Sequence, residues 1–74
     1  MKTLEMIIEE QKAKRYEGGS FGINACKESI LWEKDFLKKS LFAQLEEYVE
    51  RANNDVFFNK MMVLACWELI NENK

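Results

Sequence analysis

The chain has 74 residues, of which 11 are Lys or Arg and 13 are Asp or Glu, so its net charge at pH 7 is −2. A chain of this length forms one domain, and we expect a single helical domain over residues 1–74. Charges of both signs are mixed along the chain, without the basic stripe typical of nucleic-acid binding, so bulk nucleic-acid binding is disfavoured. The longest apolar run, residues 61–67, is far shorter than the ~20 residues that span a bilayer, and no membrane contact is expected.

Histidine is absent, and there are two cysteines, Cys26 and Cys66. The lack of histidine excludes Cys₂His₂ zinc sites and histidine-based catalytic triads. We therefore expect no catalytic residues, no metal, no cofactor and no enzyme activity. The first residues do not resemble a signal peptide, which favours a soluble, cytoplasmic protein. Both cysteines lie among apolar residues and are expected to be free, buried thiols, with a Cys26–Cys66 disulfide as the alternative.

The first predicted helix covers residues 3–16. Its apolar side chains recur at helical spacing: Met1, Leu4, Ile7 and Ile8. Glutamates come early and basic residues come late in this segment, which is the order that a helix macrodipole favours. Gly18 and Gly19 suit the left-handed position that ends many helices. A short hairpin that pairs residues 15–16 with residues 21–22 is an alternative for this region.

The second predicted helix begins at Asn24, a plausible N-cap, and extends to about residue 52. Its apolar residues follow at steps of three, four and seven: Cys26, Ile30, Leu37, Leu41, Leu45, Tyr48 and Ala52. This stripe stays in phase through Lys38, Lys39 and Ser40, which favours one continuous helix of about 28 residues, roughly 42 Å long. The alternative is that Ser40 caps a separate helix, so that the long helix is kinked or split near Lys39 and Ser40.

The third predicted helix covers residues 56–71, after a turn at residues 53–55 in which Asp55 serves as the N-cap. This helix is apolar around most of its circumference and must therefore be wrapped by other helices. Its main face carries the expected core residues: Phe58, Met62, Ala65, Cys66, Leu69 and Ile70. The sequence thus predicts an all-α fold, a small three-helix domain with a long central helix.

Two apolar groups lie away from the predicted core faces: Phe57, Met61 and Leu64 on the last helix, and Trp32, Phe36 and Ala43 on the central helix. Such a surplus in one short chain predicts self-association, most simply as a two-fold dimer. The residues predicted to form the partner or oligomer interface are Phe57, Met61, Leu64, Trp32 and Phe36. The alternatives are that both groups are buried within one chain, or that they form a groove for a different protein.

A second candidate site combines positive charge with the glycine cluster. Its predicted residues are Lys12, Lys14, Arg15, Tyr16, Gly18, Gly19, Ser20 and Phe21. A glycine-rich turn that leads into a helix can direct backbone N–H groups at an anion, and neighbouring lysines could hold a phosphate. The segment lacks the GxxxxGK[ST] spacing of a P-loop. The simpler interpretation is a connector whose Phe21 and Ile23 pack on the core.

These observations do not define one function. The favoured hypothesis is a small cytoplasmic, non-enzymatic binding protein, homodimeric, that acts by protein–protein contact as an inhibitor, adaptor or assembly factor. Its partners would be a second copy of itself and another protein. A surplus of large apolar side chains without catalytic groups is typical of small accessory or inhibitor proteins of phages and mobile elements, and the Lys-, Asn-, Glu- and Ile-rich composition suits an AT-rich genome. The alternative function is binding or sequestering a nucleotide or another phosphate ligand at residues 12–24.

Overall fold

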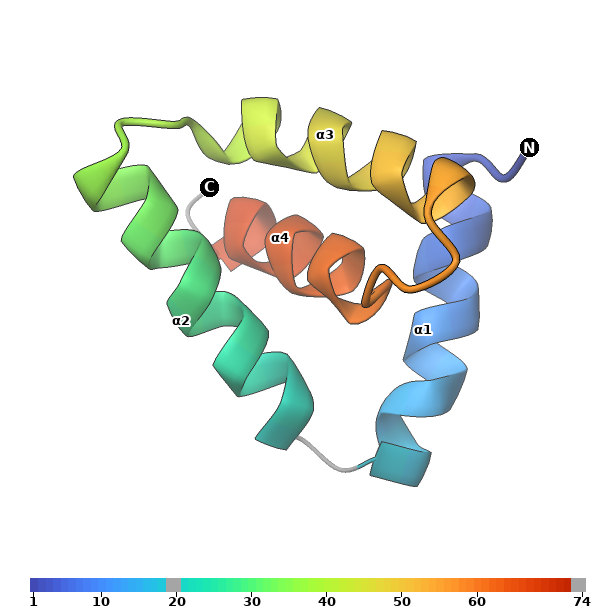
Figure 1. Cartoon of the computed structure of the whole chain (residues 1–74). Coiled ribbons are helices and arrows are strands. Elements are labelled where there is room, and N and C mark those ends of the chain that lie inside the picture. Colours follow the sequence, from blue (N-terminus) through green and yellow to red (C-terminus); the bar gives the residue numbers. More distant parts are fainter. Residues whose placement is uncertain (19–20, 73–74) are drawn as a thin grey trace.

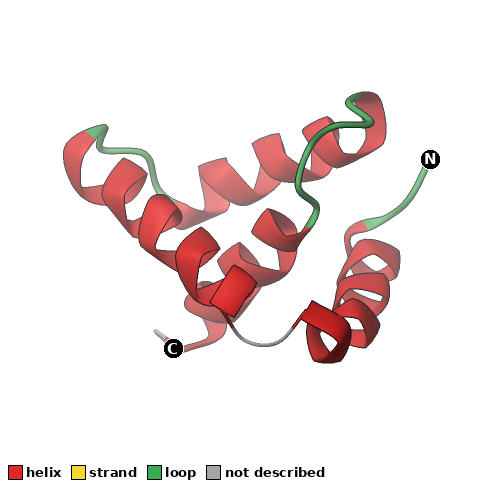
Figure 2. Ribbon diagram, turned by 60° about the horizontal axis from the view of Figure 1, so that its bottom comes forward, coloured by secondary structure: helices red, strands yellow, loops and turns green. Residues whose placement is uncertain are grey.

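The computed structural model describes residues 1–18 and 21–72, and it describes the side chains of residues 1–14 and 22–72. Within these residues there are four α-helices and no strand (Figure 2). The helices are α1 (Leu4–Gly18), α2 (Phe21–Phe36), α3 (Leu41–Asn54) and α4 (Met61–Glu72). The all-α prediction is confirmed. The prediction of three helices is wrong, because the expected central helix is two helices.

Helix α4 lies at the centre of the fold, and α1, α2 and α3 form three sides around it (Figure 1). Four consecutive α4 residues, from Val63 to Cys66, are 0 % exposed. Because successive residues of an α-helix are about 100° apart, four consecutive buried residues cover its whole circumference. The expectation that the last helix must be wrapped by other helices is therefore confirmed.

The buried apolar side chains form one core to which all four helices contribute. The radius of gyration is 11.6 Å, close to the roughly 11 Å expected for a compact domain of this length. The accessible surface is 5032 Å², near the roughly 4,800 Å² of a folded monomer of this mass. The chain closes its own core, so any contact with a partner must use the surface.

The predicted long helix is interrupted by a turn at residues 37–40. Lys38 has a φ of 56°, which is the left-handed region, and this turns the chain out of the α2 helix. Ser40 then caps α3, because its Oγ accepts a hydrogen bond of 3.1 Å from the backbone N–H of Ala43. The alternative in which Ser40 caps a separate helix is thus the correct one.

The loop between α3 and α4 is longer than predicted, and it covers residues 55–60. Asp55 does not cap α4 but follows the end of α3, where its Oδ1 accepts a hydrogen bond of 2.9 Å from the N–H of Phe57. Asn59 takes the capping role, since its Oδ1 accepts a hydrogen bond of 3.1 Å from the N–H of Met61. The last helix therefore begins five residues later than the sequence pattern suggested.

Two further expectations about the start of the chain are corrected. Residues 15–16 and 21–22 belong to α1 and α2, so they do not form the alternative hairpin. Helix α2 begins at Phe21, which places Asn24 inside the helix and excludes it as the N-cap. The first helix was placed correctly to within two residues at its end.

Lys38 provides a test of the turn between α2 and α3. A residue with a Cβ in the left-handed region is disfavoured by about 1 kcal/mol relative to glycine. We expect Lys38→Gly to raise the free energy of unfolding by up to about 1 kcal/mol in urea denaturation. Lys38→Ala is the matched control, because it removes the side chain but keeps the Cβ. A Lys38→Gly variant no more stable than Lys38→Ala would contradict the left-handed turn.

Candidate functional site

The structure separates the three residues of the predicted α4 strip. Phe57 precedes α4 and is 94 % exposed, whereas Leu64 is completely buried. Met61 is partly buried and packs against the core. The three residues do not form one surface, because the helix that would align them begins only at Met61. Leu64 is a core residue, so it does not lie on the surface with Phe57.

Trp32 and Phe36, the other two predicted interface residues, lie on the outer face of α2. Their side chains are 53 % and 70 % exposed, and their rings stack with centroids 5.6 Å apart. Further exposed apolar side chains belong to α2, to the turn after it and to the first turn of α3. Figure 1 shows the backbone where these two helices meet. We call this surface the α2–α3 corner; it consists of Leu31, Trp32, Phe36, Leu37 and Phe42.

Sequence reasoning missed part of this corner. Leu37 was placed on the buried stripe, but it lies in the turn after α2 and is 58 % exposed. Phe42 was not singled out, although it lies in the first turn of α3 and is also exposed. The signal that could have found Phe42 was its neighbour Leu41: with Leu41 on the core face, the next residue of the helix lies about 100° away and is directed outward.

A polar network beneath the corner holds α2 against α3. Gln44 is fully buried, and its Nε2 donates hydrogen bonds to the carbonyls of Ile30 at 3.2 Å and Lys39 at 3.0 Å. The hydroxyl of Tyr48 faces two acceptors, Oε1 of Gln44 at 2.8 Å and a carboxylate oxygen of Glu33. A buried amide with its hydrogen bonds satisfied fixes one arrangement of the elements around it. The helix that carries Trp32 and Phe36 is thus held to α3 by these hydrogen bonds.

Two groups of this buried region hold their protons more tightly than usual. Burial raises the pKa of Tyr48, and the neighbouring Glu33 carboxylate raises it further. Burial raises the pKa of the Cys66 thiol from 9.0 to about 11, and the thiol donates to the carbonyl of Leu41 at 3.2 Å. Since the thiolate is the nucleophilic form of cysteine, Cys66 is unreactive at neutral pH.

The predicted ligand segment is described only in part. Lys12 is engaged, with its Nζ 3.6 Å from a carboxylate oxygen of Glu9 and 5.0 Å from the ring centroid of Trp67. Lys14 is exposed. The side chains of Arg15, Tyr16 and Phe21 lie outside the described residues, as do Gly19 and Ser20, while Gly18 is the last residue of α1. Of the predicted segment, the structure thus places only the side chains of Lys12 and Lys14, and the segment as a whole stays a prediction.

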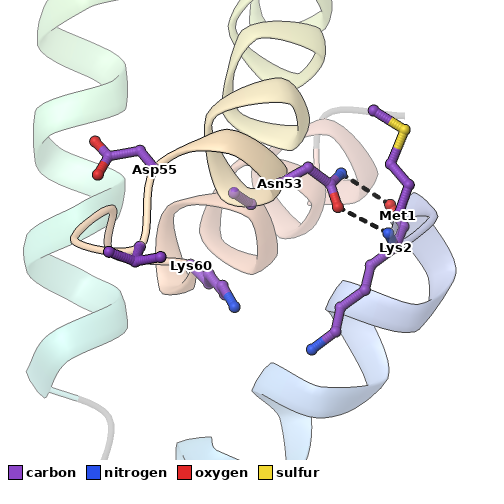
Figure 3. Close-up of a pocket in the computed structure, with 7 residues that line it drawn as sticks. Met1, Lys2, Asn53, Asp55 and Lys60 are labelled. Carbon is purple, nitrogen blue, oxygen red and sulfur yellow. Dashed lines mark hydrogen bonds between the residues drawn. The ribbon is translucent and has the colours of Figure 1, made fainter.

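A hollow lies between the N-terminal segment and the α3–α4 loop. We call it the N-terminal hollow; it is lined by Met1, Lys2, Ala52, Asn53, Asp55, Val56 and Lys60. The amide of Asn53 pairs with the backbone of Lys2, accepting from its N–H at 2.7 Å and donating to its carbonyl at 2.9 Å (Figure 3). In the same view, the side chains of Lys2 and Lys60 reach toward α1, and the Asp55 carboxylate points away from them.

A second hollow of about 340 Å³ lies beside the first and shares Val56 and Lys60 with it. We call it the lysine hollow; it is lined by Gln11, Lys14, Val56, Phe58, Asn59 and Lys60. Its volume is at the lower end of the range for small-molecule sites. Phe58 forms an apolar part of the wall; its ring stacks on Tyr48 and lies under the guanidinium of Arg51.

Other kinds of site are not found in the described part of the chain. No group of three Cys, Asp or Glu side chains among those described, in residues 1–14 and 22–72, could hold a metal ion. Cys26 and Cys66 are both free and buried, so the disulfide alternative is wrong. None of the described helices is long and apolar enough to cross a membrane.

Comparisons of the chain with protein-family models, curated proteins and solved structures gave no match. The two surfaces described above, the α2–α3 corner and the pair of hollows around Lys60, are therefore the basis of the functional argument.

The raised pKa of Cys66 predicts a loss of stability in alkali. Above pH 9 the unfolded chain releases the thiol proton while the folded chain retains it up to about pH 11, so the unfolded state is favoured as the pH rises. The free energy of unfolding should fall across this window by up to about 1.4 kcal/mol per pH unit from this group alone. Urea denaturation from pH 8 to 10 should show a shallower decline for Cys66→Ala, and equal slopes would contradict the assignment.

The different positions of Leu64 in the core and Phe57 on the surface can be tested by measuring the free energy of unfolding. Leu64→Ala leaves a cavity in the core and should lower the free energy of unfolding by about 2–5 kcal/mol. Phe57→Ala removes a side chain that is 94 % exposed and should change it by less than about 0.5 kcal/mol. Thermal and urea denaturation measure both. Similar losses for the two variants would mean that Phe57 is packed in the core.

Proposed function

We propose that the chain is a non-enzymatic binding protein that acts by protein–protein contact, with the α2–α3 corner as its contact surface. The observation that carries this proposal is the pair of stacked, exposed rings of Trp32 and Phe36 above a fixed polar network. Exposed aromatic side chains are typical of the residues that dominate binding energy at interfaces. Such a protein would serve as an inhibitor, adaptor or assembly factor.

The first occupant that we propose for the corner is a second copy of the chain. The three aromatic side chains of the corner expose roughly 400 Å². With its two leucines and a polar rim, the corner approaches the roughly 800 Å² that each partner buries in a standard interface. A patch of this size is at the upper end of what a monomer normally leaves open.

The charges around the corner fit a two-fold contact. Lys34 and Lys38 are positive, Asp35 and Glu46 are negative, and all four are exposed. None of the four forms an ion pair with another described residue. A two-fold interface requires a self-complementary surface, and a rim of both signs can place the positive side of one copy against the negative side of the other.

Sedimentation velocity over a range from micromolar to near-millimolar protein tests this proposal. We expect the mass to rise with concentration from the 8.8 kDa of one chain to twice that value. Trp32→Glu and Phe36→Glu should each weaken the dimer by about 2 kcal/mol, roughly thirty-fold in Kd.

Phe57→Glu is the matched control, since it places the same charge on an exposed aromatic position outside the corner. It should leave the dimer unchanged. A single-chain mass at every concentration would refute the second copy as the occupant. Equal weakening by Phe57→Glu and Phe36→Glu would remove the corner as the contact surface.

A further inference from the structure

Gln11 is the most unusual residue of the lysine hollow. Its side chain is only 5 % exposed, yet it makes no hydrogen bond to any residue that the structure describes. Elsewhere among the described side chains, those of residues 1–14 and 22–72, every fully buried N or O atom has a partner. The polar atoms of the Gln11 side chain can still contact water, because Gln11 lines the hollow. A buried amide that is open only to a hollow offers hydrogen bonds to whatever occupies that space.

Two positive charges flank this amide. Lys14 comes from α1 and Lys60 from the last position of the α3–α4 loop, and neither forms an ion pair within the described residues. The hydrogen bond from Lys2 lowers the pKa of Glu10, and the charges of Lys60 and Lys14 lower it further. The ammonium groups of Lys14 and Lys60 therefore both act on the surface around Glu10. Glu10 is itself neutralised by Lys2, whose Nζ lies 2.7 Å from its carboxylate. The hollow is therefore left with an excess of positive charge.

The beginning of α4 adds to this field. Asn59 and Lys60 immediately precede the first residue of α4, a helix of 12 residues. The N-terminus of a helix carries a partial positive charge and favours anions. The N-terminal hollow is less suited to an anion, because its Asn53 amide is occupied by the Lys2 backbone and its lining includes the Asp55 carboxylate.

We propose that the lysine hollow binds the phosphate group of a small phosphomonoester. Lys14 and Lys60 would neutralise the phosphate, and the Gln11 amide would donate to one of its oxygens. The organic part of the ligand would lie against Phe58 and Val56, which form the apolar wall of the hollow. Of the two side chains that the structure describes in the segment indicated by the sequence for an anion, Lys14 lines this hollow and Lys12 does not. The proposal does not depend on the α2–α3 corner.

Phenyl phosphate is a suitable probe, because its ring can contact the apolar wall. We expect a titration at constant ionic strength, followed by amide NMR, to shift the Gln11 side-chain amide and the backbone signals of residues 59–62. Lys60→Gln and Gln11→Leu should each weaken binding about tenfold, since each removes a hydrogen bond to a charged group. Inorganic phosphate should bind more weakly than phenyl phosphate.

Lys34→Gln is the matched control, because it removes an exposed lysine on α2 without touching the hollow. It should leave the affinity unchanged. Lys14→Gln changes an exposed side chain, keeps the fold and should also weaken binding, so the test does not depend on the buried position. The proposal is refuted if the shifts spread equally over Lys34 and Lys60, if Lys14→Gln and Lys60→Gln bind normally, or if no signal moves.

Discussion

The complete burial of one turn of α4 is the constraint on which the rest of the structure depends. A helix with four consecutive residues removed from solvent needs neighbours on every side, and the described part of the chain offers three other helices for this. This requirement also explains why the central segment is split. A continuous rod of about 28 residues would be roughly 42 Å long, whereas the longest dimension of the molecule is 29 Å. Only a turn after Phe36 allows α3 to come back over α4.

The sequence pattern predicted the faces of the helices better than their ends. Cys26, Ile30, Leu41, Tyr48 and Ala52 were expected on one face, and all five are buried. The same stripe could not reveal the break between α2 and α3. It stays in phase on both sides of the turn, and the helical repeat does not show whether the residues of the turn are themselves helical. The late start of α4 had a similar cause. Val56 and Phe57 are as apolar as core residues, and only the hydrogen bonds of Asp55 and Asn59 exclude them from the helix.

The candidate surfaces were partly predictable for the same reason. Trp32 and Phe36 were recognised as lying off the core face, since that face is defined by local periodicity. Leu64 could not be judged in this way, because whether the second side of α4 is covered depends on where α3 lies. Gln11 gave no signal in the sequence. A glutamine on an amphipathic helix is normally solvated, and only the tertiary packing of α1 against the α3–α4 loop makes it a buried amide.

The side-chain amide of Asn53 pairs with the main chain of Lys2 and not with its side chain. The Asn53 amide contacts the N–H and the carbonyl of residue 2, as a neighbouring strand would, and it makes no demand on the side chain. The attachment of the first residues to α3 therefore accepts any amino acid at position 2 except proline, which has no N–H. It is strict about position 53, where aspartate would lose the donor and leucine would lose both partners. Substitutions of the Lys2 side chain can therefore change the charge around the hollows while the N-terminal segment stays attached to α3.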